Sequence, residues 1–393
     1  MHERWDHRAD LAQQAITDRH ASKVWGVPRT NLAVIAWPPL ARDKAFYRWH
    51  YWWQAHYVDC QVDATRRRPS KARQRELRAT LRGMRLRNLA PLTRNNYYDD
   101  KAWLALALWR AEQYTKVKRV SARKDLEENI LAGVDSLTGV LPWRSNETFY
   151  NVPTNGPVAI MAARTGRLDL ARQLVDWIWE NMINEDGLVM DGLWMRMNGP
   201  VPEPTIHSYC QGVALGACVE LAVAEREQAR VGDDEVSEAG MDYIYRACGL
   251  IDAISEHLTN SNYVITAPTA GGDGGLFNGI LVRYLALAAE KLPELGPRTR
   301  KARSQARRIV LHSAESAWRY RLEVDGLPVF PSRWDRDATL PHSGGLVGAT
   351  IAGAVASSDI AERDLSVQLS GWKLMEAAAR ITGLEAAQRE QGN

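Results

Sequence analysis

Apolar residues recur at helical spacing through almost the whole chain, and this feature constrains the fold more than any other. Alternating stretches of the kind that form strands are sparse, and occur only near 188–194 and 327–331. The helical spacing predicts helices over residues 8–20, 44–66, 73–88, 97–115, 121–137, 157–165, 168–183, 207–229, 238–258, 276–292, 298–321 and 361–383. About a dozen helices in one chain fit either a six-hairpin helical toroid or a helical solenoid.

The connections between the predicted helices help to separate these two architectures. A solenoid requires a repeating period with its own punctuation, and no such self-similarity is visible in the sequence. Instead, long Gly-, Pro- and Asn-rich connections fall at 138–157, 184–205, 259–275 and 323–347. Long, chemically rich connections on a helical frame are where binding sites usually lie. No low-complexity linker interrupts the chain, so we expect a single all-α domain over residues 1–393.

Composition bounds the class of protein. Of the 393 residues, 45% are hydrophobic and 25% are charged, which allows a sizeable buried core. No stretch approaches the roughly 20 apolar residues of a membrane span. The N-terminal segment, MHERWDHRADLAQQAITDRH, is charged throughout and lacks the apolar core of a secretory signal, so we expect a cytoplasmic protein.

Four cysteines are too widely spaced for a zinc site or a disulfide framework, and we expect reduced, mostly buried thiols at Cys60, Cys210, Cys218 and Cys248.

The charge pattern gives no reason to expect a nucleic-acid partner, because the net charge is only +3. Two basic runs stand out, Arg66, Arg67, Arg68, Lys71, Arg73 and Arg75 in one and Arg298, Arg300, Lys301, Arg303, Arg307 and Arg308 in the other. Solvated helix faces are the favoured interpretation. The alternative is a weak contact with an anionic surface, such as a phosphorylated glycolipid or an acidic membrane leaflet. Neither run is interleaved with the aromatic residues that a site for single-stranded nucleic acid requires. We expect the protein to be a monomer.

Tryptophan is unusually frequent, with 15 Trp against only 4 Phe. Core packing rarely needs Trp where Phe would serve, because the indole N–H requires a hydrogen-bond partner. Flat aromatic faces with a polar edge do suit sugar rings, whose axial C–H groups stack on them. The composition therefore hints at a carbohydrate ligand.

The strongest local signal is NNYYDDKAWLALALWRA at 95–111, which reads as an amphipathic helix with Asn95 or Asn96 as N-cap. Asp99 and Asp100 then fall in the first turn, where the helix dipole favours anionic side chains. Two acidic residues at a helix start often have no role beyond their favourable interaction with the helix dipole. Here the flanking tyrosines and Trp103 indicate partial burial, and two desolvated carboxylates in contact cannot both ionise cheaply. One protonated acid and one ionised nucleophile would result, which is the division that glycoside hydrolysis requires.

Neighbouring carboxylates at a helix start are compatible with the separation of about 5–5.5 Å found in retaining glycosidases. Paired aspartates also bind magnesium pyrophosphate in helical terpene synthases. That site needs a third acid nearby on the same face, whereas Lys101, Trp103 and Leu104 follow the pair here. The spacing therefore disfavours a metal site.

These residues resemble glycoside hydrolase family 76, the endo-α-1,6-mannanases, whose Tyr-Asp-Asp motif is matched by Tyr98-Asp99-Asp100. Further similar segments follow in family order over about residues 45–290: WWQAH at 52–56, Asn151-Val152-Pro153-Thr154-Asn155, GLVMDGL at 187–193, SYCQGVALGA at 208–217 and GGDGGLFNGILVRYLA at 271–286, with a weaker match in SAESAW at 313–318. The sequence departs from the family pattern at His56, Cys210 and Asn278, where the family has Asn, Asn and Lys. These departures affect the substrate subsites and leave the aspartate pair intact.

The resemblance implies an (α/α)6 barrel and retaining hydrolysis of α-1,6-mannosidic links in mannan or mannooligosaccharide, with no metal or other cofactor. It makes Asp99 the nucleophile and Asp100 the general acid/base. The residues expected to contact substrate are Tyr98, Trp143, Asn151, Asn155, Asp191, Trp194, Tyr209, Gln211, Asp273 and Trp334. Among these, the tryptophans are candidate stacking platforms, and the polar side chains are candidate hydrogen-bond partners of sugar hydroxyls. His56 is expected to be a core histidine without a chemical role.

Two alternatives stay open on the sequence. One is another enzyme on the same toroid, either an unsaturated-glucuronyl hydrolase or a sugar epimerase. An epimerase needs two histidines poised across the barrel, and the nine histidines show no obvious arrangement of that kind. The other is a non-catalytic protein that binds or remodels mannan, against which the presence of both aspartates argues.

Overall fold

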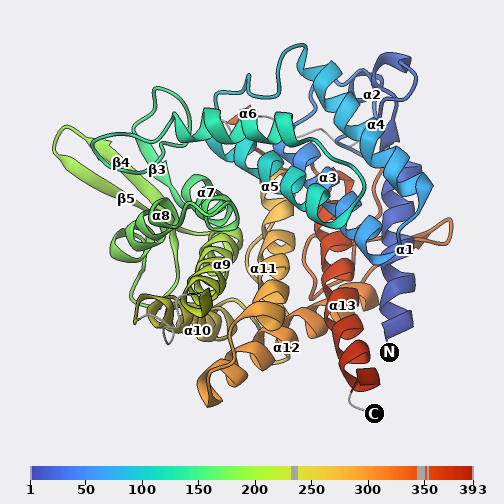
Figure 1. The fold of residues 1–393 in the computed structure, drawn as a ribbon. Coiled ribbons are helices and arrows are strands. Elements are labelled where there is room, and N and C mark those ends of the chain that lie inside the picture. Colours follow the sequence, from blue (N-terminus) through green and yellow to red (C-terminus); the bar gives the residue numbers. More distant parts are fainter. Residues whose placement is uncertain (1, 232–237, 343–349, 352–353, 392–393) are drawn as a thin grey trace.

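The computed structural model describes residues 2–231, 238–342, 350–351 and 354–391, and the chain is predominantly helical in these ranges (Figure 1). The helices are α1 (His2–Arg19), α2 (Ala41–Lys44), α3 (Tyr51–Arg67), α4 (Lys71–Asn88), α5 (Tyr98–Tyr114), α6 (Val120–Leu131), α7 (Val152–Arg164), α8 (Leu168–Asn181), α9 (Ser208–Val231), α10 (Glu238–His257), α11 (Phe277–Lys291), α12 (Pro297–Arg319) and α13 (Leu365–Gln391).

Six of these helices form a closed inner ring. Helices α3, α5, α7, α9, α11 and α13 pack each against the next, and α13 closes the ring against α3. Helices α1, α4, α6, α8, α10 and α12 pack outside them. Because inner and outer helices alternate along the chain, the inner helices run in the same direction and their N-terminal ends meet at one end of the barrel (Figure 1). The fold is the expected (α/α)6 barrel.

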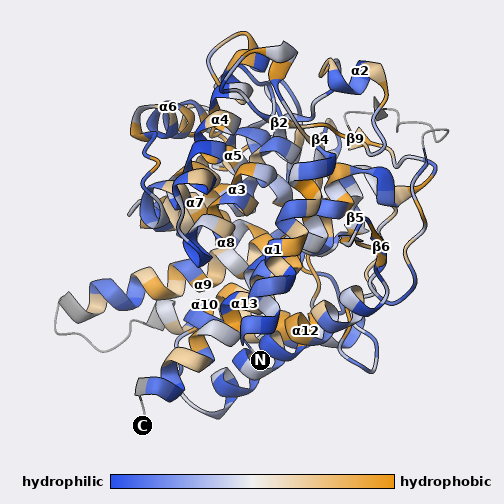
Figure 2. Ribbon diagram, turned by 90° about the vertical axis from the view of Figure 1, so that its right-hand side faces the viewer, coloured by the Kyte–Doolittle hydropathy of each residue, from blue (hydrophilic) through white to orange (hydrophobic). Residues whose placement is uncertain are grey.

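The sequence pattern explains which helices lie inside. Inner helix α7 is buried at every position from Val152 to Ala163, as expected for a helix covered on all sides. Outer helix α8 instead buries one stripe, Leu168, Ala171, Leu174, Val175 and Ile178, at the spacing of a single helix face. Figure 2 shows the same alternation of apolar and polar residues along the peripheral helices.

A small antiparallel sheet stands at one edge of the barrel, with strand order β3 (Phe149–Asn151), β4 (Met190–Arg196), β5 (Gly199–Ile206). The strand signal at 188–194 is confirmed by β4. The sequence placed 199–205 in a loop, and that expectation was wrong. Strand β5 carries Pro200, Pro202 and Pro204, which cannot donate to a ladder, and it is accommodated because it is an edge strand paired only with β4.

The other strands form two-stranded ribbons, β1 (Ala21–Ser22) with β2 (Leu32–Ala33), β6 (Leu322–Val324) with β7 (Leu327–Val329), and β8 (Thr350–Ile351) with β9 (Ala354–Val355). Strand β7 confirms the signal at 327–331. Short 3-10 helices lie at Val24–Gly26, Gly272–Leu276 and Ala361–Arg363.

Several helix boundaries differ from the prediction: α1 begins at His2 and not at residue 8, α6 ends at Leu131 and not at 137, and α13 covers Leu365–Gln391 and not 361–383. Two further differences have a local cause. The predicted helix 44–66 begins only at Tyr51, because His50 takes a left-handed φ of 45° that interrupts it. The predicted helix 157–165 begins at Val152, with Pro153 in the first turn and Pro157 inside. Proline is favoured at helix starts. The prediction placed Pro157 at the start of this helix, whereas Pro153 occupies that position.

The four cysteines are free and buried, as predicted. In the part of the chain that the structure describes, no helix is long and apolar enough to cross a bilayer.

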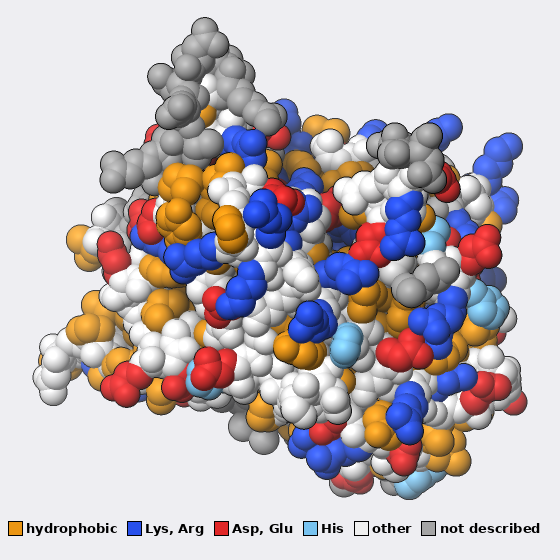
Figure 3. Space-filling model, turned by 90° about the horizontal axis from the view of Figure 1, so that it is seen from below, with side chains coloured by type: hydrophobic (Ala, Val, Ile, Leu, Met, Phe, Trp, Pro, Cys, Tyr) orange, Lys and Arg blue, Asp and Glu red, His pale blue; other side chains and the backbone are white. Residues whose placement is uncertain are grey.

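Most cations of the two basic runs have carboxylate partners within the chain. Arg67 bonds Glu376 and Asp10, and Arg303 lies 3.3 Å from Glu294. Viewed along the barrel from below, Lys and Arg side chains are interspersed with Asp and Glu (Figure 3). An anionic contact through these runs stays a prediction.

Candidate active site

A cleft of about 760 Å³ opens where the N-terminal ends of the inner helices meet. Eight of the predicted site residues line it: Asp99, Asp100, Trp143, Asn151, Asp191, Trp194, Tyr209 and Asp273. They come from separate connections and helix starts that only the closed ring brings together. Helix N-termini present unpaired N–H groups and positive dipole ends, which suits a site rich in carboxylates.

Asp99 lies in the first turn of α5 and accepts two hydrogen bonds. Its Oδ1 accepts from the backbone N–H of Asp100 at 2.9 Å, and its Oδ2 accepts from Nε1 of Trp143 at 3.0 Å. Burial raises the pKa of Asp99 to about 7, and the negative charge of Asp273 adds to this, while the two hydrogen bonds lower it. Both donors stabilise the ionised carboxylate.

Asp100 is held differently. Its Oδ2 accepts one hydrogen bond from Nδ2 of Asn95 at 2.6 Å. Burial raises the pKa of Asp100 well above its ordinary value, and the neighbouring charge of Asp99 raises it further. The two carboxyl groups therefore differ in their surroundings: Asp99 accepts two hydrogen bonds that favour its charge, whereas Asp100 accepts one and lies beside the charge of Asp99, which favours its protonated form.

Two more aspartates face the cleft. Asp273 lies in the short 3-10 helix before α11 and accepts hydrogen bonds from the indole N–H groups of Trp52 and Trp53 at 3.0 and 2.9 Å. Asp191 lies where the β4–β5 register shifts, and such irregularities re-aim side chains beside active sites. Burial raises the pKa of Asp273 to about 6 and that of Asp191 to about 7.

Aromatic rings form two of the cleft walls. Phe149 and Trp194 are cross-strand partners in β3 and β4, and their rings stack with centroids 4.5 Å apart. Opposite residues on paired strands lie close enough for such contacts. On the other wall, Tyr209 stacks on Phe277 at 3.9 Å with the rings almost parallel. Carboxylates between aromatic faces are an arrangement suited to holding and cleaving a sugar chain.

The sequence profile described as glycosyl hydrolase family 76 matches residues 12–358. The chain belongs to glycosyl hydrolase family 76. It is therefore a glycoside hydrolase, as the resemblance of its motifs implied.

Solved structures show the same fold. The α-1,6-mannanase GH76A of Salegentibacter sp. HEL1_6 is 23% identical, with a TM-score of 0.75, and the match covers 96% of this chain and 99% of that one. A second structure of that mannanase is an inactive variant with two adjacent aspartates replaced by asparagine, bound to α-1,6-mannotriose; it is likewise 23% identical, with a TM-score of 0.74 and the same coverage of both chains.

The mannosidase Bt3792 of Bacteroides thetaiotaomicron is 14% identical at a TM-score of 0.70, covering 97% of this chain and 100% of its own. No curated protein sequence matches this family 76 hydrolase significantly.

Four predicted substrate contacts of the hydrolase are placed elsewhere by the structure. Trp334 is only 1% exposed and packs in the hydrophobic core. Gln211 is buried and bonds the backbone of Val189 through both ends of its amide. Asn155 is buried and bonds the backbone of Leu141 in the same way. These three predictions were wrong because a polar side chain near a helix start can bond the neighbouring backbone, and a tryptophan in a connection can pack in the core, as readily as either can contact a ligand.

Tyr98 is the fourth. Its ring packs over Gly133 and under the ammonium of Lys101, 4.1 Å from the ring centroid, and it does not line the cleft. The preceding residue, Tyr97, lines the cleft instead. A shift of one residue at a helix start turns the side chain by about 100°, which the motif alone does not fix.

Several cleft residues of the hydrolase were not predicted, including His50, Phe149, Glu203, His207 and Phe277. His207 lies two residues before the predicted site residue Tyr209, and this proximity was an available signal. Glu203 gave none, because its strand read as a Pro-rich loop. Among the described residues, no group of three or more His, Cys, Asp or Glu side chains could hold a metal ion.

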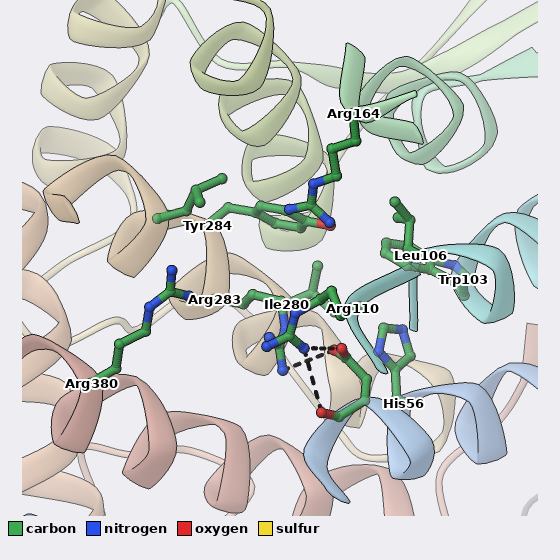
Figure 4. A pocket seen from close by; sticks show the side chains of 11 residues that line it. His56, Trp103, Leu106, Arg110, Arg164, Ile280, Arg283, Tyr284 and Arg380 are labelled. Carbon is green, nitrogen blue, oxygen red and sulfur yellow. Dashed lines mark hydrogen bonds and ion pairs between the residues drawn. The ribbon is translucent and has the colours of Figure 1, made fainter. Parts of the chain in front are cut away.

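Beneath the cleft lies a cluster of buried charges (Figure 4). Asp59 of α3 bonds Arg110 of α5, and it also lies 2.8 Å from Arg283 of α11 and 2.8 Å from Lys373 of α13. His56, which packs against Trp103 of the cleft, lies between this cluster and the cleft. Burial lowers the pKa of His56 well below its ordinary value, so the ring is neutral, and the expected core placement is confirmed. The cluster ties four inner helices together below the site.

Proposed function

We propose that this protein is a retaining endo-α-1,6-mannanase, with Asp99 as nucleophile and Asp100 as general acid/base. The observation that carries the proposal is the asymmetry of the pair. Asp99 accepts two hydrogen bonds that favour its charge, whereas Asp100 accepts one, and the neighbouring charge of Asp99 raises the pKa of Asp100. An ionised nucleophile beside a protonated acid is the starting state of retaining hydrolysis.

In the proposed mechanism, the Asp99 carboxylate attacks the anomeric carbon of an α-mannosyl unit while the bond to the departing 6-oxygen breaks. Asp100 gives its proton to that oxygen. The product is a β-mannosyl ester on Asp99. Asp100, now ionised, takes a proton from water, whose oxygen attacks the anomeric carbon and frees Asp99, so the released sugar has the α configuration.

Aromatic walls hold the mannan chain in this scheme, and the remaining polar side chains fix its hydroxyls. Trp194 and Phe149 offer one stacked face, and Tyr209 offers another. Asn151 supports the same role, because its buried Oδ1 has no hydrogen-bond partner within the described chain. The Salegentibacter relative, whose inactive double-aspartate variant is bound to α-1,6-mannotriose, supports both the substrate and the pair.

The test is hydrolysis of linear α-1,6-mannan, followed by chromatography of the products and proton NMR of their initial anomeric form. Wild-type protein should release short oligosaccharides as α anomers. Asp99→Asn and Asp100→Asn should each lose at least roughly a hundredfold in rate. Asp186→Asn, an exposed loop aspartate outside the cleft, is the matched control and should keep full activity. β anomers as first products would exclude the retaining mechanism, and an active Asp99→Asn would exclude the nucleophile.

Azide separates the two roles. In Asp100→Ala, with an activated mannoside, azide should restore turnover and give α-mannosyl azide, because it intercepts the ester on Asp99. In Asp99→Ala the same reagent should give β-mannosyl azide by direct displacement. The reverse pattern would exchange the two assignments.

The alternative of a mannan-binding protein without turnover predicts retention of mannooligosaccharide and no product in this assay. An epimerase predicts a changed sugar and no chain cleavage. His50 and His207 both line the cleft, so the second outcome has candidate residues, but neither outcome agrees with membership of a hydrolase family.

A further inference from the structure

A basic surface lies at the same end of the barrel as the cleft. It is built by the segment 25–47, which includes α2, and by the C-terminal end of α4 (Figure 1). We define the rim surface by its exposed residues Trp25, Arg42, Tyr47, Arg82, Arg85 and Leu89.

Hydrogen bonds from side chains to backbone carbonyls hold its segments side by side. Nε1 of Trp25 donates to the carbonyl of Ala45 at 2.9 Å, and Arg87 donates to the carbonyls of Phe46 and Tyr47 at 2.7 and 3.1 Å. Arg82 donates to the carbonyl of Arg29 at 2.8 Å.

The rim surface is strongly cationic because its segments contain almost no acid. Residues 21–49 and 77–97 hold ten Lys or Arg and one carboxylate, Asp43. Asp43 is buried and accepts a hydrogen bond from the backbone N–H of Leu40, so it does not offset the exposed charge. Arg42 and Arg85 have no carboxylate partner among the described residues. The rim surface differs in this from the face in Figure 3, where both signs are mixed.

Large apolar side chains stand among these cations. Tyr47 is 77% exposed, Leu89 is 71% exposed and Trp25 is 47% exposed. Leu89 and the two arginines of α4 also line an open groove of about 1220 Å³. Cations that surround exposed aromatic and aliphatic groups are the pattern of a surface that enters the headgroup region of an anionic bilayer.

The rim surface borders the cleft directly. The chain that follows Leu89 runs from the rim surface to the cleft. The hydroxyl of Tyr51, a residue that lines the cleft, donates a 2.9 Å hydrogen bond to the carbonyl of Leu92. Three residues later, Asn95 donates to Asp100. A lipid bilayer against the rim surface would therefore lie beside the mouth of the cleft.

We propose that the rim surface docks the protein on an anionic lipid bilayer, and that the substrate is a mannan chain anchored in that bilayer by a lipid. The docking part stands on the rim surface alone, whereas the substrate part rests on the proposed mannanase activity. Nucleic acid fits the same charge less well, because Leu89 and Val27 are exposed aliphatic groups without a role on a phosphate backbone.

Docking is measured by co-sedimentation of the full chain with vesicles of phosphatidylcholine containing about a third phosphatidylglycerol, and with pure phosphatidylcholine vesicles. We expect binding only to the anionic vesicles, weakened by salt. The double variant Arg82→Glu/Arg85→Glu should lose at least about tenfold in apparent vesicle affinity. Lys71→Glu/Arg75→Glu, an equal charge reversal on exposed residues at the other end of the same helix, should retain wild-type binding.

The apolar part has its own variants. Tyr47→Ser and Leu89→Asn should weaken binding without changing its salt dependence, and asparagine tolerates the left-handed φ of 54° at position 89. Equal loss in both charge-reversal variants would overturn the rim surface as the docking site. Failure to bind anionic vesicles, or equally tight binding of a DNA duplex, would overturn the lipid partner.

The substrate part is tested with α-1,6-mannotetraose on a lipid anchor in the same anionic vesicles, against the same oligosaccharide free in solution. Arg82→Glu/Arg85→Glu should cleave the free oligosaccharide at the wild-type rate and the anchored one at least about tenfold more slowly. If the wild type cleaves neither substrate, the proposed function is rejected, and the vesicle-binding result still decides the docking surface. If the variant cleaves the anchored oligosaccharide as fast as the wild type does, the proposal of a lipid-anchored substrate is overturned, and the docking proposal is not affected.

Discussion

Nε1 of Trp143 donates a 3.0 Å hydrogen bond to Oδ2 of Asp99 and holds the carboxylate that we propose as nucleophile. This bond lowers the pKa of Asp99 against the effect of burial, which raises it to about 7. Trp143→Phe keeps the ring and removes the donor, so the pKa should rise. Because Asp99 must be ionised to attack, the acidic limb of kcat/KM should move about one pH unit upward.

The measurement is the pH profile of kcat/KM on α-1,6-mannan. Trp179→Phe on outer helix α8, outside the cleft, is the control and should leave the acidic limb in place. An unchanged limb in Trp143→Phe would mean that the indole does not tune Asp99.

The hydrogen bond from Asn95 to Asp100 should govern the opposite limb. Asn95 lowers the pKa of Asp100, which burial raises well above its ordinary value. Asp100 must be protonated to release the leaving group, so loss of the donor in Asn95→Ala should extend activity to higher pH. Asn95→Asp keeps the local acceptor for the N–H of Tyr97 and adds a negative charge, so it should move the alkaline limb further. A limb that moves downward in either variant would contradict Asp100 as the acid.

Asp99→Asn should be more stable than the wild type at pH 8. A carboxyl group whose pKa is raised in the folded state stabilises the fold fully below its unfolded pKa, near 3.8, and this stability is lost as pH rises through about 7. Asparagine avoids the loss, and without the Asp99 charge the pKa of Asp100 also falls. Urea unfolding should give a gain of about 2 kcal/mol at pH 8 that shrinks toward zero at pH 4. A pH-independent difference would contradict the burial of an ionising group.

Lys373→Met should destabilise the protein through the charge cluster beneath the cleft. Lys373 is 2% exposed and lies 2.8 Å from Asp59, so its removal leaves part of a buried carboxylate charge uncompensated. The expected loss is about 3 kcal/mol in urea unfolding. The double variant Asp59→Asn/Lys373→Met should lose less than the sum of the two single changes. Strict additivity would mean that the pair does not interact.

Much of the frame could be predicted from the sequence. Helical periodicity marks the inner and outer helices because each must bury a stripe or a whole surface, and the helix predicted at 97–115 differs from α5 by one residue at each end. The position of the aspartate pair could also be predicted. Its place in the first turn follows from the start of the helix, and its burial follows from its aromatic neighbours.

Other features depend on contacts that periodicity does not contain. Whether Tyr97 or Tyr98 faces the cleft depends on how α5 begins, and Trp334 is buried because the segment after β7 folds back onto the core. The β5 strand and its Glu203 escaped prediction because three prolines mask an edge strand. His207 and Phe277 reach the site only through the closure of the ring.

Ring closure also sets when the protein can first work during its synthesis. The residues that line the cleft all precede α13 in the sequence, so they are translated before this last helix. However, α13 packs against both α11 and α3 and so closes the ring, and it also supplies Lys373, the partner of Asp59. A nascent chain that lacks this helix carries both aspartates that we propose as catalytic, Asp99 and Asp100, on an open arc of hairpins. The cleft is therefore complete only after α13 has been translated and has packed between α11 and α3. A chain that ends before residue 365 should show no activity toward any sugar.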